Sequence, residues 1–289
     1  MSNAPLVVTG AGSGIGNALV RRLRADGQEV LALDRRFPDD EVGSVGGGAN
    51  LVCDLSDPDS IADTVLRVPD RIAGLANVAG VPGTADTRTV LAVNYLGTRA
   101  LTSALAARIG PGGAVVNVAS VAAHRNTLPD EEITRLLEIR TLDELDLWLT
   151  EHEAAGEPFA GPAAYDTSKR LVVDWTKHVA AELLPSGVRC LSVSPGPVTT
   201  PILDDFAASM GQASMDRSVQ AVGRHGRPDE IAAVIAFVLS SDARWVNGVD
   251  IMAEGGLLAT RAAAAQPLAV PALQEPAPEE AVTPQEDAA

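Results

Sequence analysis

Short apolar segments of strand length alternate along most of this chain with longer segments whose apolar residues recur every three or four positions. Continuous apolar strands are typical of a parallel sheet that is buried on both faces, because helices carry the chain back between successive strands. We therefore predict an α/β fold, with one doubly wound, seven-stranded parallel sheet in a single domain. The expected strands are residues 6–9, 30–33, 51–53, 74–78, 114–118, 188–193 and 249–252.

Two segments depart from this alternation. Residues 124–160 are rich in charge and carry two amphipathic patterns, the second of which opens with a capping box from Thr141 to Glu144. We expect a helix–turn–helix insertion there, between the fifth strand and the helix that follows. Residues 262–289 contain five prolines and five acidic residues but no lysine or arginine. Such a segment cannot bury a core, so we expect a disordered tail after a folded domain at 1–261.

Charge and cysteine content argue against several classes of protein. With 22 basic and 38 acidic residues the formal net charge is −16, which disfavours binding to nucleic acid or to an anionic membrane surface. No apolar run is long enough to span a bilayer, and no basic region precedes an apolar stretch as in a signal peptide. Cys53 and Cys190 are isolated, which predicts reduced thiols in a cytoplasmic protein. The histidines lack metal-ligand spacing, so no metal site is expected.

A glycine-rich turn, TGAGSGIG at residues 9–16, follows the first expected strand and opens the first helix. A turn without side chains lets the backbone approach a pyrophosphate, to which the helix N-terminus offers unpaired N–H groups. Asp34, at the end of the second strand, could accept from both hydroxyls of an adenosine ribose and would repel a 2′-phosphate. This favours NAD, although Arg35 and Arg36 beside it could welcome NADP. Asp54, after the third strand, could accept from the adenine amine or cap the next helix.

Tyr165 and Lys169 are four residues apart in YDTSK, which places both on one face of a helix. A nearby ammonium would lower the pKa of the tyrosine, which could then exchange a proton with an alcohol or carbonyl oxygen during hydride transfer. Ser120 ends the fifth strand and could hold that oxygen, or bond its own backbone. Asn94 lies in mid-helix, an unfavourable place for asparagine, and could bond a water that contacts Lys169. Asn77 closes the fourth strand, and a structural role beneath the cofactor is an equal alternative for it.

Together these motifs resemble the short-chain dehydrogenase/reductase family over residues 4–260, through TGAGSGIG, NVAG at 77–80, the Asn94 helix, Ser120, YDTSK, and SPGPVTTP at 194–201. The resemblance implies a Rossmann-type fold and a catalytic set of Ser120, Tyr165, Lys169 and Asn94. It implies that the cofactor is contacted by Thr9, Gly10, Ser13, Gly14, Ile15, Gly16, Asp34, Asp54, Asn77, Ala79, Gly80, Tyr165, Lys169, Pro195, Gly196, Val198 and Thr200.

The spacing of 45 residues between Ser120 and Tyr165, longer than in most members, points to a subgroup. With segments 77–85, 93–97, 195–203, 244–251 and 254–260, it resembles the coniferyl-alcohol dehydrogenases and the 3α-hydroxysteroid dehydrogenase/carbonyl reductases. In that subgroup the insertion obstructs the usual tetramer, so the resemblance implies a homodimer formed through about 229–253.

We therefore expect NAD-dependent oxidation of a small apolar alcohol, aromatic or allylic as in coniferyl alcohol, reversible as carbonyl reduction. A 3α-hydroxysteroid is the alternative substrate, because apolar walls discriminate poorly between similar shapes. Two alternatives belong to other classes: a catalytically inactive NAD(P)-sensing binding protein, and a dehydratase or epimerase. The insertion and residues 202–220 are expected to wall the substrate slot, unless they simply pack on the body. The candidate wall residues are Trp148, Leu149, Phe159, Phe206 and Met210.

Overall fold

The computed structural model describes residues 4–37, 49–154, 159–201 and 211–266, together with 203, 205 and 208. Within these residues, seven parallel strands form one sheet in the order β3-β2-β1-β4-β5-β6-β7. The predicted class and strand number are confirmed, and the largest difference in bounds is an earlier start of the fifth strand. The strands are β1 (Leu6–Thr9), β2 (Val30–Asp34), β3 (Asn50–Val52), β4 (Ile72–Asn77), β5 (Ile109–Val118), β6 (Arg189–Pro195) and β7 (Asp250–Ala253).

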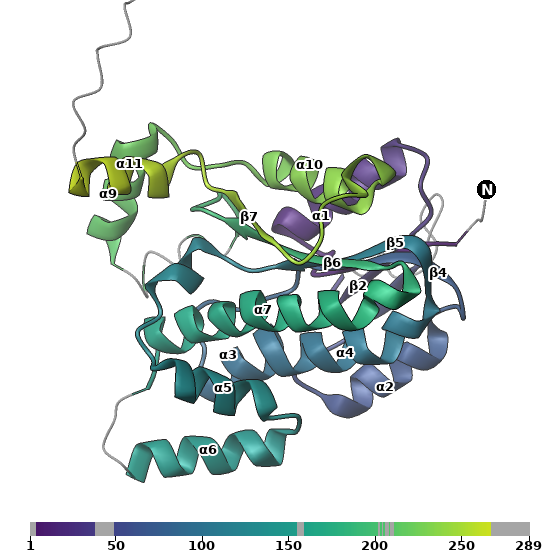
Figure 1. Ribbon diagram of the computed structural model, residues 1–289, viewed down its shortest axis with the longest axis horizontal. Coiled ribbons are helices and arrows are strands. Elements are labelled where there is room, and N and C mark those ends of the chain that lie inside the picture. The colour runs from purple at the N-terminus through teal and green to yellow at the C-terminus, as the bar shows by residue number, and fades with distance from the viewer. Residues whose placement is uncertain are drawn as a thin grey trace, which may run out of the picture.

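Helices cover both faces of the sheet (Figure 1). On one face, α1 (Gly14–Ala25) and α10 (Pro228–Leu239) pack against each other. The other face carries α2 (Pro58–Arg67), α3 (Thr87–Leu91), the π-helix η1 (Ala92–Gly97), α4 (Thr98–Leu105) and α7 (Pro162–Leu183). Since all strands run in one direction, their carboxyl ends meet at one edge. The strand order reverses between β1 and β4, where open α/β sheets bind their ligands.

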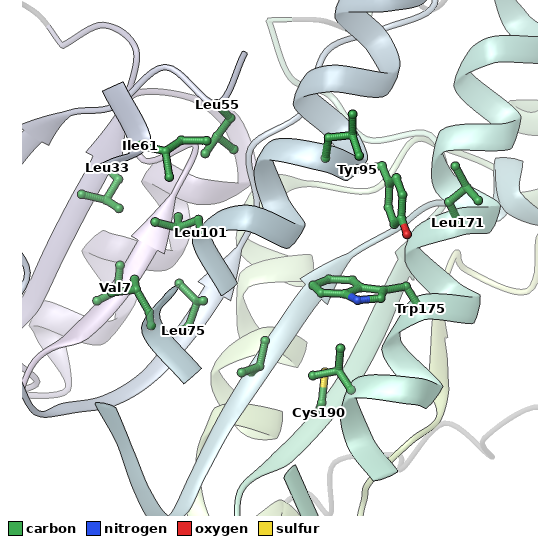
Figure 2. Close-up of a cluster of buried hydrophobic side chains, with 14 of the residues drawn as sticks. Val7, Leu33, Leu55, Ile61, Leu75, Tyr95, Leu101, Leu171, Trp175 and Cys190 are labelled. Carbon is green, nitrogen blue, oxygen red and sulfur yellow. The ribbon is translucent and has the colours of Figure 1, made fainter. Parts of the chain in front are cut away.

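The core between the sheet and the α4–α7 layer is an apolar cluster with members from β1 to β6, part of which is drawn in Figure 2. Val7 of β1, Leu101 of α4 and Leu171 of α7 are fully buried in it. Tyr95 and Trp175 meet edge to face with their ring centroids 6.2 Å apart. Burial of each such side chain contributes about 1.5–3 kcal/mol. This packing fixes α7, the helix that carries the YDTSK motif, against β5 and β6.

The charged insertion forms the two expected helices, α5 (Asp130–Glu138) and α6 (Leu142–Ala154), after the short 3-10 helix η3 (Val121–Arg125). The capping box is present, because the Glu144 amide donates to Thr141 Oγ1 at 3.2 Å and the Thr141 amide donates to Glu144 Oε2 at 3.1 Å. α5 packs on α7 and α6 on α3, so the pair forms an outer layer on that side of the molecule (Figure 1).

Arg99 of α4 ties this outer layer to the body. Its Nη1 donates to the carbonyl oxygens of Leu137 at 2.7 Å and Ile139 at 3.1 Å, and to Tyr95 Oη at 2.9 Å. Tyr95 Oη in turn donates to the Leu137 carbonyl at 3.2 Å. The C-terminal end of α5 is therefore held by the π-helix that also contains Asn94.

The C-terminal part of the described chain differs from the expectation. α11 (Leu257–Ala265) packs on α9 (Gln212–Val222) and crosses the predicted domain boundary at residue 261, because the alanine-rich stretch 262–265 continues the helix. Residues 267–289 lie outside the described residues, so the disordered tail stays a prediction. The short 3-10 helices are η2 (Ala106–Arg108), η4 (Leu184–Ser186) and η5 (Ser241–Ala243). None of the helices in the described part of the chain combines the length and apolar content needed to cross a bilayer.

Candidate active site

A cavity of about 300 Å³ lies at the carboxyl ends of the strands. It draws residues from the loops after β1 to β6 and from α7, which are far apart in the sequence. Most of the predicted site residues line it, namely Thr9, Gly10, Ser13, Gly14, Ile15, Gly16, Asp34, Asp54, Ala79, Gly80, Ser120, Tyr165, Lys169, Pro195, Gly196, Val198 and Thr200. Asn77 and Asn94 are not among its lining residues.

The glycine-rich turn presents bare backbone to this cavity. Gly10 and Gly14 have positive φ values of 68° and 53°, which favour glycine. A Cβ at Gly10 would lie 2.7 Å from the Ala79 amide nitrogen, and one at Gly14 would lie 3.3 Å from the Thr200 side chain. The Ser13 hydroxyl makes no capping hydrogen bond at the start of α1. The first N–H groups of α1 therefore border a cradle that fits a pyrophosphate.

Two carboxylates lie farther along the cavity. Asp34 accepts from the Gly12 amide through Oδ2 at 2.9 Å and from the Arg36 amide through Oδ1 at 3.0 Å. Each oxygen keeps a lone pair that a ribose hydroxyl could use. Asp54 accepts from the Ser56 amide and hydroxyl at 2.8 and 2.6 Å, which holds the loop before α2. The two carboxylates therefore fit an adenosine. Asp54 also holds the loop before α2, which is close to the capping role given above as its alternative.

Tyr165 and Lys169 lie on one face of α7, as their spacing predicts. Lys169 Nζ is 5.7 Å from the centroid of the Tyr165 ring and donates to the Val118 carbonyl at 3.0 Å, at the end of β5. Ser120 follows the same strand and hydrogen-bonds Tyr165. Its Oγ also accepts from the Ala122 amide at 3.2 Å, so the serine binds its own backbone as well. A phenol, an ammonium and a hydroxyl thus meet in one cavity.

The environment shifts the pKa values of both groups on α7. Burial raises the pKa of Tyr165 to about 12, and the hydrogen bond to Ser120 and the charge of Arg125 oppose this only in part. Burial also lowers the pKa of Lys169 to about 8. In the protein alone, loss of hydration therefore outweighs the groups that lower the pKa of Tyr165, and the expected contribution of Lys169 stays a prediction. At neutral pH Tyr165 is a neutral phenol.

Asn94 acts as a clamp beneath the cavity. It is buried in the π-helix, a geometry that is frequent at functional sites. Its Oδ1 accepts from the Val81 amide at 2.8 Å, and its Nδ2 donates to the Val81 carbonyl at 3.1 Å and to Ser168 Oγ at 3.0 Å. Ser168 Oγ donates to the Tyr165 carbonyl at 2.8 Å. Asn94 therefore joins the loop after β4 to the tyrosine helix, and the water bound to it stays a prediction.

Asn77 has the structural role that was its alternative, and its predicted cofactor contact stays a prediction. Its Nδ2 donates to Thr102 Oγ1 and to Asn117 Oδ1, both at 2.8 Å, and the side chain is buried under the sheet edge. Asn117 continues the network by donating to Thr176 Oγ1 at 2.9 Å. These bonds connect β4 and β5 with the helices above them, and they keep Asn77 out of the cavity.

The candidate wall residues that the structure describes do not line the cavity. Trp148, Leu149 and Phe159 pack on the core instead, with Trp148 and Phe159 edge to face at 5.2 Å. Phe206 and Met210 lie outside the described residues. Arg125 of the insertion and Met215 and Ser218 of residues 202–220 do line the cavity, although the sequence analysis did not name them. It also missed other lining residues, among them Val81, Thr89, Ala122, Leu257 and Arg261. Arg125 could have been found from the sequence, because it lies only five residues after Ser120 and therefore near the same end of the strands.

A family model described as short chain dehydrogenase matches residues 5–129, and one described as enoyl-(acyl carrier protein) reductase matches residues 150–258. The coniferyl-alcohol dehydrogenase of Pseudomonas sp. strain HR199 is 38% identical over 261 residues, which cover 90% of this chain and 98% of that protein.

Hydroxysteroid enzymes are similar over the same range. The 3-alpha-hydroxysteroid dehydrogenase/carbonyl reductase of Comamonas testosteroni is 30% identical over 260 residues, covering 87% of this chain and 95% of that protein. The crystal structure of the 3-alpha-hydroxysteroid dehydrogenase from Pseudomonas sp. B-0831, complexed with NADH, superposes with a TM-score of 0.75. The two sequences are 31% identical, and the match covers 90% of this chain and 99% of that one.

Proposed function

This chain belongs to the short-chain dehydrogenase/reductase family, and from that premise we propose that it interconverts an alcohol and its carbonyl compound with NAD. The observation that carries the proposal is the convergence of Ser120, Tyr165 and Lys169 on one cavity beside the glycine-rich turn. An inactive NAD(P)-sensing protein would have no use for a buried phenol beside a buried ammonium. A dehydratase or epimerase is disfavoured by the glycine spacing of the turn.

NAD is the cofactor that the site fits best. Gly10 packs too closely on the Ala79 backbone for any side chain, so the turn keeps a bare backbone beside the N-terminus of α1, which suits a pyrophosphate. Asp34 would bind the adenosine ribose hydroxyls and repel a 2′-phosphate, although Arg35 also lines the cavity. The NADH complex of the related hydroxysteroid dehydrogenase supports this preference. When bound, NAD accepts or returns a hydride at the substrate carbon.

The side chains around the substrate oxygen would divide the remaining work. Ser120 positions the oxygen, and Tyr165 Oη takes its proton in alcohol oxidation and returns it in carbonyl reduction. The high pKa of Tyr165 in the protein alone keeps its phenol protonated, which suits the reducing direction. Lys169, anchored to the Val118 carbonyl, places a cation beneath the phenol, where it favours the phenolate. Asn94 acts as the positioning residue that holds the helix of Tyr165.

The substrate would be an apolar alcohol of the coniferyl type. Val81 and Ala122 pack with Tyr165, and Met215 and Leu257 add to the apolar lining of the cavity. The 38% identity to a coniferyl-alcohol dehydrogenase supports this choice. A 3α-hydroxysteroid is the second candidate, supported by the relative from Comamonas testosteroni and by the structural match.

A homodimer through residues 229–253 is proposed as the assembly. β7 is an edge strand, and four large apolar side chains are exposed in this region: Trp245 at 98%, Phe237 at 48%, Val249 at 45% and Met252 at 38%. Apolar surface of this kind marks an interface. α5 and α6 cover α7 and α3, which disfavours a further contact through that side. The cytoplasmic location stays a prediction.

The test is a turnover assay that follows NADH absorbance with coniferyl alcohol, a 3α-hydroxysteroid and a small cyclic alcohol. Tyr165→Phe should reduce turnover by about 10²–10⁴-fold, while NAD affinity measured by calorimetry is retained. Tyr95→Phe is the matched control, because the chain has two tyrosines and Tyr95 lies in the core outside the cavity. Near-wild-type turnover by Tyr165→Phe would show that the mechanism is wrong.

A further inference from the structure

Arg125 brings a guanidinium to the edge of the active-site cavity. It ends η3, which begins directly after Ser120 and packs along the start of α7. Asn126 fixes this corner by donating from Nδ2 to Thr167 Oγ1 at 2.6 Å. The Arg125 side chain lines the cavity and is 34% exposed. It is therefore the contribution of the charged insertion, which begins at 124, to the candidate active site.

Asp166 holds this guanidinium in place. It is the residue after Tyr165 on α7, and its Oδ1 accepts from Arg125 Nη2 at 2.8 Å. The Asp166 side chain is 14% exposed, so the pair is partly withdrawn from water and is screened less than a surface ion pair. The pair thus places one positive and one negative charge beside the same phenol.

The other charged groups on the elements around Tyr165 have bonding partners of their own. Lys169, on the same helix, is anchored to β5. On α3, which packs Val90 against Tyr165, Asp86 caps the helix and Arg88 pairs with Asp146 of α6 at 2.6 Å. On η3, His124 contacts Asp250 of β7 at 3.3 Å. The remaining charged residues that line the cavity are Asp34, Arg35, Asp54 and Arg261.

The charges of the pair act on Tyr165 with opposite sign. Arg125 lowers the pKa of Tyr165, whereas Asp166 raises it. An arginine stays charged throughout the working pH range, whereas burial lowers the pKa of Lys169 to about 8. Arg125 therefore supplies a positive charge that persists where Lys169 begins to lose its own.

We propose that Arg125 and Asp166 are positioning residues that form a charge pair and together set the balance between phenol and phenolate at Tyr165. The inference rests on the proposed role of Tyr165 as acid and base. It assigns a function to the aspartate within YDTSK and to the first residues of the insertion. In this arrangement Arg125 favours the phenolate, and Asp166 both orients Arg125 and offsets its charge.

The kinetic test compares Arg125→Gln with Asp166→Asn. In alcohol oxidation the acid limb of the kcat/KM profile should move up by about 0.5–1 pH unit in Arg125→Gln and down by a similar amount in Asp166→Asn. Arg125→Lys should restore most of the wild-type limb. Arg88→Gln is the matched control, since it breaks an ion pair away from the cavity and should leave the limb in place. Lower activity in both variants with an unmoved limb would show a purely structural role and overturn the proposal.

A second readout does not depend on turnover. With tyrosine labelled with ¹³C at Cζ, the chain gives two signals, and Tyr165→Phe assigns them. The onset of Tyr165 ionisation should occur at higher pH in Arg125→Gln than in Asp166→Asn. Coincident onsets would overturn the charge-pair inference even if turnover is found. If the two variants differ in the pH at which Tyr165 begins to ionise but the protein turns over no alcohol, only the proposed reaction is contradicted.

Discussion

Replacing Asp34 with alanine separates the two cofactors that the cavity could bind. Asp34 lies at the end of β2 and holds the turn by accepting from the Gly12 and Arg36 amides. Loss of these two bonds loosens the turn for NAD and NADP alike, so it cancels in the ratio of their kcat/KM values. The ratio therefore reports only what Asp34 does to the adenosine ribose.

The expected change follows from two contributions. Losing a hydroxyl bond to a half-buried carboxylate costs about 2 kcal/mol, a roughly 30-fold fall in kcat/KM with NAD. A carboxylate about 4 Å from a phosphate charge repels it by between about 1 and 4 kcal/mol, depending on the effective dielectric constant. Relief of even about 1.4 kcal/mol would raise kcat/KM with NADP roughly 10-fold. The NAD:NADP ratio should therefore fall by roughly 300-fold.

The assay is initial-rate kinetics with each cofactor at saturating alcohol. Asp26→Ala is the matched control, because Asp26 is exposed at the end of α1 and pairs with Arg22 there. It should leave the ratio unchanged. An Asp34→Ala ratio within about threefold of wild type would refute the assignment of Asp34 to the ribose, as would a wild-type enzyme that uses NADP alone.

Three further outcomes are expected. Lys169→Met should raise the free energy of unfolding at pH 7 by up to about 3 kcal/mol, because burial lowers the pKa of Lys169 from 10.5 to about 8 and the unfolded chain holds this proton more tightly. The gain should shrink as the pH rises through this range in urea denaturation, and a loss at pH 7 would contradict it. Asn94→Ala removes the bonds that Asn94 makes to both backbone groups of Val81 and takes one donor from the Ser168 hydroxyl, so calorimetry should show a loss of about 2–4 kcal/mol in the free energy of unfolding. An unchanged Tm would refute this role of Asn94. Trp245→Asp should yield monomers in light scattering, and an intact dimer would place the interface elsewhere.

Much of the fold and site followed from periodicity and from strand ends. The apolar runs identified the strands because helices bury both faces of a parallel sheet, so these runs lack polar alternation. Asp34 and Ser120 could be placed in one cavity since the carboxyl ends of parallel strands share an edge. Tyr165 and Lys169 could be paired because four residues make about one helical turn.

Other features depend on contacts that a linear pattern does not contain. The amphipathic stripe with Trp148 predicted burial correctly, but it could not say that the burying partner is the core. The pairing of Arg125 with Asp166 joins two helices through residues that are 41 positions apart in the sequence. The high pKa of Tyr165 arises from the packing around it, which outweighs the spacing of charges on its own helix.

The hydrogen bonds of Arg99 couple the charged insertion to the body of the fold. Excising residues 126–160 would remove the Leu137 and Ile139 carbonyls. The Arg99 guanidinium would then keep only the Tyr95 hydroxyl of these three acceptors. Chimeras that exchange this segment should therefore keep a residue at position 99 that can donate to its two carbonyls.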